Sequence, residues 1–177
     1  MKFKLVPEPP ARVDFVADAQ AAVPLVPGSE DDCCARLMRR VGFRSRGVAR
    51  TWLTFLRALD LATETPEGFK RLRTEPTPAH LREHLLAGVY GATDVADALL
   101  AASDAGTAPV TVAAAFEGFA DRVPDWERYR TTDWESVWRE RVGRLLGWLV
   151  LLDLAEERNG GYVATETLRT LRDEGDG

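Results

Sequence analysis

The chain has 177 residues, a formal net charge of −5, and 45% hydrophobic residues. This composition is sufficient for a packed core, and the length allows one ordinary domain or two small ones. No apolar run approaches the roughly 20 residues that span a bilayer, and the N-terminus has no stretch suited to a signal peptide. These features exclude a membrane-spanning protein, and we expect the chain to be cytoplasmic.

The composition is biased. Isoleucine is absent, asparagine occurs once, and three lysines stand against 20 arginines. Such a bias is typical of a GC-rich genome, such as that of a halophilic archaeon or an actinomycete. Arginine therefore takes nearly every basic role in this protein.

The first predicted helix covers residues 10–22, because Pro10 suits a first helical turn and two prolines follow the segment. Ser29 is a suitable N-cap for a second helix, which we expect over residues 30–41. Gly42 is placed to end that helix, since glycine adopts the left-handed conformation that helix C-termini favour.

Ser45 is positioned to cap a third helix over residues 46–60. Residues 63–72 then have the pattern of two short strands joined by a turn at Pro66-Glu67-Gly68. The first part of the chain is therefore predicted to contain three helices followed by a β-hairpin.

An internal repeat appears when the chain is aligned with itself at an offset of 93 residues. Residues 52–69 then lie on residues 145–162 without a gap, and eight of 18 positions are identical. Leucines of helices align easily by chance, but the shared Asp-Leu-Ala, glutamate and glycine, followed by an aromatic residue, do not. We interpret the two segments as copies of one unit, each a helix followed by a hairpin.

The second copy has its own preceding helices and ends in a polar segment. The expected elements are helices over 78–89, 93–102 and 110–121, an insertion at 122–133, a long helix over 134–152, a hairpin turn at Asn159-Gly160, and a frayed tail over 166–177.

The segments LATETPEGFKRL and LAEERNGGYVAT resemble the end of the recognition helix and the wing of many archaeal and bacterial winged helix-turn-helix proteins. The resemblance covers most of the chain and singles out no narrower family. It implies a mainly α-helical fold with short β-hairpin wings (an α+β class) in two tandem winged-helix domains. We place these domains at residues 1–74 and 75–177, the second being divergent and carrying the insertion.

Positive charge is concentrated in one segment. Residues 36–57 contain seven arginines and no acid, whereas the other 155 residues carry 16 basic and 28 acidic side chains. At 100° per residue, helix 46–60 places its apolar residues, among them Trp52 and Leu56, on one face. Its arginines fall on the opposite face, together with Thr54.

This pattern predicts binding to double-stranded DNA, and the winged-helix resemblance implies a transcriptional regulator. Arginine binds the guanine edge and pairs well with phosphate. In the winged-helix fold the third helix is the one that enters the major groove. The residues expected to face the groove are Arg46, Arg50, Thr54 and Arg57; those expected to contact phosphates are Arg39, Arg40, Arg44, Lys70 and Arg71. Contacts to three to five phosphates imply a log–log salt slope of about −3 to −4.

A second interpretation is a tandem winged-helix adaptor that binds proteins and no nucleic acid. The arginines of residues 36–57 would then pair with acids of the same chain or of a partner. The two interpretations differ in what they expect of Arg46, Arg50 and Arg57. Salt bridges from these residues within the chain would weaken the regulator hypothesis, and free side chains beside a projecting wing would strengthen it.

The second domain does not repeat the arginine face. Its long helix carries a mixed, partly apolar outer face, so we expect that domain to pack against a partner, against the first domain or against another copy of the chain. Its aromatic residues, which include Trp126 and Tyr129, are candidates for a partner contact or for anchors of the insertion.

No catalytic or cofactor-binding pattern is present in the sequence, and we expect a protein that is not an enzyme. His80 and His84 lie one helical turn apart but have no evident third ligand, so no metal site is predicted. No cofactor is expected.

Overall fold

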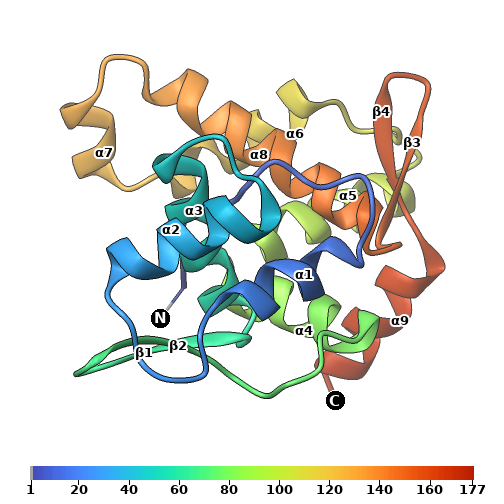
Figure 1. Cartoon of the computed structure of the whole chain (residues 1–177). Coiled ribbons are helices and arrows are strands. Elements are labelled where there is room, and N and C mark those ends of the chain that lie inside the picture. Colours follow the sequence, from blue (N-terminus) through green and yellow to red (C-terminus); the bar gives the residue numbers. More distant parts are fainter. Residues whose placement is uncertain (1) are drawn as a thin grey trace. The chain divides into compact units, whose positions relative to one another are not determined.

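A computed structural model describes residues 2–177 (Figure 1). The chain divides into two compact units, a first unit that ends at Tyr90 and a second unit, Gly91–Gly177. Among the described residues no helix is both long enough and apolar enough to cross a membrane.

The first unit has three helices, a hairpin and a closing helix. These elements are α1 (Phe15–Ala22), α2 (Glu30–Val41), α3 (Arg46–Ala58), β1 (Ala62–Thr65), β2 (Gly68–Arg71) and α4 (Pro78–Gly88). The order confirms the mainly α-helical fold with a short hairpin wing that the sequence predicted.

Local capping sets the ends of α2 and α3, as predicted. The Ser29 hydroxyl accepts a hydrogen bond from the Asp32 N–H, and Ser45 does the same for Val48, each at 3.1 Å. Gly42 ends α2 in the left-handed conformation with φ of 77°. The first helix is shorter than predicted and begins at Phe15, because a turn whose Phe15 N–H donates to Arg12 precedes it.

The amide of Gln20 ties α1 to the chain around the hairpin. Gln20 is a buried polar side chain, and its Nε2 donates to the carbonyl oxygens of Leu72 and Thr74 at 3.1 and 2.8 Å. A buried amide needs such partners, since an unsatisfied polar group costs about 1–3 kcal/mol. These bonds fix the wing against the helices of the first unit.

Helix α4 lies against α3 within the first unit. His80 Nε2 donates to the carbonyl of Leu59 at 2.7 Å, and a Cβ on Gly88 would overlap the backbone of Ala58. The first unit therefore ends after α4, whereas the sequence predicted a domain boundary after residue 74.

The second unit repeats the plan with a longer third helix and added elements. It contains α5 (Ala92–Ala105), α6 (Val112–Phe119), a 3-10 turn (Ala120–Arg122), α7 (Asp125–Arg130), α8 (Trp134–Leu151), β3 (Ala155–Arg158), β4 (Gly161–Ala164) and α9 (Glu166–Gly175). Helix α7 lies in the predicted insertion. The Asn159-Gly160 turn is confirmed, since it joins β3 and β4.

The expectation of a frayed tail is wrong. Residues Glu166–Gly175 form α9, which Thr165 caps by accepting a hydrogen bond from Leu168 N–H. Arg169 and Arg172 of α9 then pair with Asp104 and Asp97 of α5, at 2.9 and 2.8 Å. These long-range ion pairs hold a polar helix that has little apolar surface of its own to bury.

The internal repeat corresponds to one backbone plan used twice. Asp60 and Asp153 both follow the third helix with positive φ, at 56° and 61°. Each third helix and its strand are then joined by equivalent bonds, Leu61 N–H to Leu56 O at 2.9 Å and Leu154 N–H to Leu149 O at 2.8 Å.

The shared glycine of the repeat has a steric cause. In the first unit the backbone of Gly28 pairs with Phe69, and a Cβ on Gly68 would overlap the Gly28 carbonyl. In the second unit Val110 pairs with Tyr162, and a Cβ on Gly161 would lie 2.9 Å from the Val110 carbonyl oxygen. In each unit a single residue of a preceding segment, Gly28 or Val110, therefore pairs with the second strand of the hairpin. It lies so close to the neighbouring glycine that any larger residue there would displace the backbone.

Candidate nucleic-acid interface

Only the N-terminal half of α3 is exposed. Arg46 and Arg50 are exposed, whereas Leu53, Phe55 and Leu56 are all buried. Helix α3 is amphipathic in its first two turns and enclosed nearly all round in its last turns. Residues of α3 that can contact a partner therefore lie in its N-terminal half. Thr54, at the junction, is half-buried.

The two exposed arginines of α3 pair with acids at the start of α2. The Arg46 guanidinium hydrogen-bonds the Asp31 carboxylate, and Arg50 Nε lies 3.4 Å from Glu30 Oε1. The second interpretation expected pairs of this kind between arginines of residues 36–57 and acids of the same chain. Both arginine side chains remain more than half exposed, and exposed pairs of this kind contribute only about 0–1 kcal/mol.

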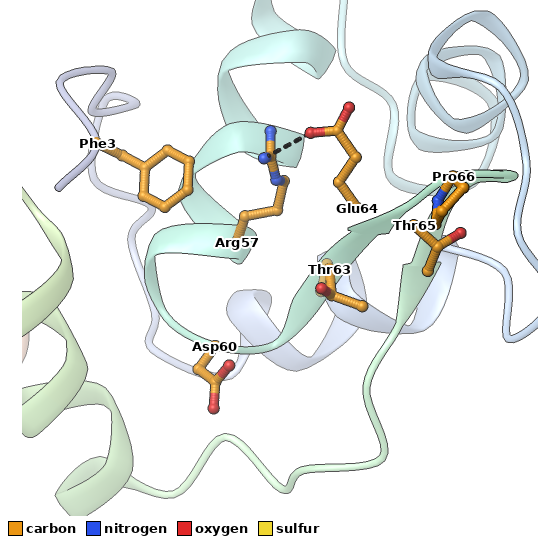
Figure 2. Close-up of a pocket in the computed structure, with 8 residues that line it drawn as sticks. Phe3, Arg57, Asp60, Thr63, Glu64, Thr65 and Pro66 are labelled. Atoms are coloured by element: carbon orange, nitrogen blue, oxygen red, sulfur yellow. Dashed lines mark hydrogen bonds and ion pairs between the residues drawn. The ribbon is translucent and has the colours of Figure 1, made fainter. Parts of the chain in front are cut away.

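Arg57 is enclosed. Figure 2 shows its side chain between Phe3 and Glu64, with Nη2 2.8 Å from Glu64 Oε2. The guanidinium carbon also lies 5.1 Å from the centre of the Phe3 ring and 5.2 Å from that of Phe69. Only 22% of the Arg57 side chain is exposed. The predicted line of three exposed arginines is therefore wrong at its third member, because two aromatic rings and a carboxylate surround it.

An open cavity of about 480 Å³ lies beside this ion pair, between the N-terminal segment, the end of α3 and β1 (Figure 2). The Arg57–Glu64 pair and Asp60, which follows α3, are among the residues that line it. No sequence pattern pointed to Phe3, which reaches Arg57 because its backbone hydrogen bonds with Gly88 and Tyr90 hold it there.

A separate group of arginines stands at the end of α2 and in the following turn. Arg39, Arg40 and Arg44 are exposed, and none of the three forms an ion pair or hydrogen bond with another described residue. Arg36, on the preceding turn of α2, is half-buried and donates from Nε to the carbonyl of Ala22 at 3.0 Å. We name Arg39, Arg40 and Arg44 the α2 basic cluster.

The acids of α2 are too far along the helix to neutralise the α2 basic cluster. Asp32, the last acid of α2, precedes Arg39 by seven positions, which is about 10.5 Å at 1.5 Å per residue. This separation is about one Debye length at 0.1 M salt, so the attraction is strongly screened. Helix α2 therefore carries its acids at the N-terminus and its free cations at the C-terminus.

The wing contributes fewer free cations than predicted. Arg71 Nη1 donates to the carbonyl of Ala21 at 3.3 Å, which turns it toward α1. Lys70 is half-buried and Arg73 is exposed, and neither has an ion pair within the described chain.

The cysteines and histidines form no reactive centre. Burial raises the pKa of both the Cys33 and the Cys34 thiols, so the nucleophilic thiolate is disfavoured. The His80 and His84 rings stack at 3.9 Å and bond to backbone carbonyls. In residues 2–177 no group of histidine, cysteine or carboxylate side chains is arranged to hold a metal ion.

The chain matches the family model of the halobacterial double winged helix domain over residues 1–169. It belongs to this family. No curated protein and no solved structure matches the chain significantly. Membership confirms the two winged helix-turn-helix copies that the repeat and the hairpins predicted.

Winged-helix domains are typically DNA-binding domains without enzymatic activity, so the family suggests a DNA-binding or regulatory role for this double winged helix protein. Among the described residues around α3 and the first hairpin, the basic side chains without an ion pair include those of the α2 basic cluster, Lys70 and Arg73.

Proposed function

We propose that this double winged helix protein binds duplex DNA through its first unit and acts as a transcriptional regulator in the cytoplasm. One observation carries the proposal: the α2 basic cluster presents three exposed guanidinium groups, without intramolecular ion pairs, immediately before the recognition helix. Guanidinium groups pair with phosphate oxygens bidentately, and backbone contacts of this kind supply most of the affinity of a DNA-binding domain.

The role of α3 in this proposal is secondary. Arg46 and Arg50 are salt-bridged, the outcome that weakens a mechanism based on groove reading by α3. Their pairs are exposed and weak, so a phosphate or a guanine edge can replace the carboxylates. Glu30 and Asp31 would then lie near the DNA backbone and oppose binding. We therefore expect phosphate contacts to dominate over base readout.

The four remaining predicted residues differ in how they relate to the proposed interface. Arg57 is left out of the proposed interface because its guanidinium is enclosed by Phe3, Phe69 and Glu64. Lys70 remains a candidate phosphate contact, whereas Arg71 must first release the Ala21 carbonyl. Thr54 is half-buried and can contact DNA only at the edge of the interface.

The test is a fluorescence anisotropy titration with a labelled random duplex of about 20 base pairs in 50 mM salt. Replacing Arg39, Arg40 and Arg44 together with alanine is expected to weaken binding by about 100-fold or more, since three phosphate contacts are lost. The matched control replaces Arg12, Arg122 and Arg158, which pair with acids outside the α2 basic cluster. Both triple variants lose three positive charges. A difference in their duplex affinity therefore reports the position of the arginines and not the net charge.

Two results would refute the proposal. One is the absence of measurable duplex binding by the wild-type chain in 50 mM salt. The other is an equal loss of affinity in the two triple variants, which would reduce the effect to net charge. Arg50→Glu tests the contribution of α3 separately, and unchanged binding in this variant would remove α3 from the interface.

A protein-binding adaptor is the second candidate function. The pairing of Arg46 and Arg50 with acids of α2 favours it, because it shows that this face already accepts carboxylates. Recovery of a stoichiometric protein partner, with no duplex binding by the purified chain, would establish the adaptor in place of the regulator.

A further inference from the structure

Exposed large apolar side chains gather in two places within residues 2–177. One is the loop between α1 and α2, where Leu25 is 43% exposed and Val26 is 75% exposed. The other is the insertion of the second unit together with the start of α8, where Trp126, Tyr129 and Val137 are 56%, 90% and 38% exposed. Burying such side chains in a partner is favourable by about 25 cal/mol per Å² of apolar surface.

The insertion encloses a pocket of about 240 Å³ between α7 and α8. Its apolar walls are Trp126, Trp134, Val137 and Trp138. Sites for small-molecule ligands usually measure about 300–1,000 Å³. This pocket is smaller, and its size suits one or two aliphatic side chains of a protein segment.

The pocket also carries positive charge. Arg141 forms an ion pair with Glu127, with Nη1 3.7 Å from Oε2, and its guanidinium carbon lies 4.7 Å from the centre of the Trp138 ring; its buried Nη1 has no hydrogen-bond partner. Burial lowers the pKa of Arg141, the expected sign for a cation that lacks full solvation. Arg130, at the rim, is exposed and forms no ion pair with the described residues. The pocket therefore suits a protein segment that presents an aliphatic side chain and, beside it, a carboxylate.

The loop of the first unit has that chemistry. Leu25 and Val26 stand between two prolines, which restrict the backbone, and the carbonyl of Pro24 is bonded to Arg71 N–H at 2.7 Å. Asp32, in the first turn of α2, follows Val26 by six residues, is exposed, and has no ion pair among the described residues. The loop and the start of α2 therefore present an apolar anchor and a carboxylate.

We propose that the pocket of the second unit binds the α1–α2 loop of a second copy of this chain. Val26 of one copy fills the space between Trp126 and Trp134 of the other. Asp32, in the first turn of the α2 helix that follows this loop, pairs with Arg130. The contact joins two different surfaces, so each copy carries one donor loop and one acceptor pocket. This proposal is independent of DNA binding.

Sedimentation equilibrium of the full chain, up to about 0.5 mM, tests the contact, because self-association with a Kd as weak as about 1 mM is detectable there. The wild-type weight-average mass is expected to rise above the 19.6 kDa of one chain as concentration increases. Val26→Asp and Arg130→Glu should each hold the mass near that of one chain. Both positions are exposed, and circular dichroism verifies that each variant folds.

Mixing the two variants gives the sharper result. The Arg130→Glu chain keeps an intact loop and the Val26→Asp chain keeps an intact pocket, so the mixture regains one contact and forms dimers but nothing larger. Ala87→Asp, which adds the same charge at an exposed position of α4, is the control and should associate like the wild type.

Three outcomes overturn the proposal: a wild-type chain that remains monomeric throughout, association that both variants retain, or a mixture of variants that does not form dimers. A monomeric wild type would assign the pocket to a different protein partner.

Discussion

The two units share a backbone plan and differ in the surface around their third helix. In both units an aspartate with positive φ follows that helix. In both, a single residue of a preceding segment pairs with the second strand of the hairpin, in close contact with a glycine of that strand. In the first unit the exposed end of α3 and the α2 basic cluster carry arginine. In the second unit the insertion surrounds the start of α8 with tryptophan and tyrosine.

The comparison separates residues that the fold requires from residues that it does not. Asp60, Gly68 and their partners Asp153 and Gly161 are kept because the backbone needs them at these positions. At the 93-residue offset most arginines of the first unit have no counterpart in the second (Arg46 alone aligns with an arginine, Arg139), and the second unit folds without the others. Their presence therefore calls for a functional explanation, whereas that of the shared glycine does not.

The largest expected effect tests the shared plan. Gly68→Ala should destabilise the protein by about 3 kcal/mol, because the new Cβ overlaps the Gly28 carbonyl and φ is +131°. Gly161→Ala should cost about 1 kcal/mol, since its nearest contact is 2.9 Å and relaxation can relieve it. Urea unfolding of both variants measures the difference. Equal values would mean that the crossing strand constrains both hairpins alike.

The next effect concerns the acids that face α3. Replacing Glu30 with glutamine and Asp31 with asparagine frees Arg46 and Arg50, and duplex affinity should rise by about tenfold, or roughly 1.4 kcal/mol. The control replaces Glu156 and Glu157 of β3 with glutamine, which changes net charge equally in the second unit. An anisotropy titration that found equal gains in both variants would show that α3 has no specific role.

The smallest effect separates stability from binding at Arg57. Arg57→Gln removes contacts with two rings and with Glu64, which should lower stability by about 1 kcal/mol. Duplex affinity should not change, because the guanidinium is enclosed. Thermal unfolding and the same titration give both quantities. A loss of affinity in a folded variant would return Arg57 to the interface.

Elements with local signals were predicted well from the sequence. Ser29, Ser45 and Gly42 set the ends of α2 and α3 because capping depends only on neighbouring residues. The repeat was detectable because both units place an aspartate at a position of positive φ and a glycine at a position where a Cβ would overlap the neighbouring backbone. Thr165 supplied a comparable cap signal for α9, which the polar composition of the tail obscured.

Features that depend on distant residues were not accessible from the sequence. Helix α9 is held by Arg169 and Arg172 through acids of α5, far away in the chain. The enclosure of Arg57 depends on Phe3, from the N-terminal segment. Helical periodicity places Arg57 on the polar face of α3 correctly, but it carries no information about the ring that covers that face.

The central claim is that phosphate contacts by the α2 basic cluster hold the protein on DNA. The most direct test is the slope of log affinity against log salt concentration for the wild-type chain and for the variant with alanine at Arg39, Arg40 and Arg44. Three phosphate contacts give a wild-type slope of about −3, equivalent to about 40-fold weaker binding in 200 mM than in 50 mM salt. We expect the slope of the triple variant to approach zero. An unchanged slope in the triple variant would contradict the account.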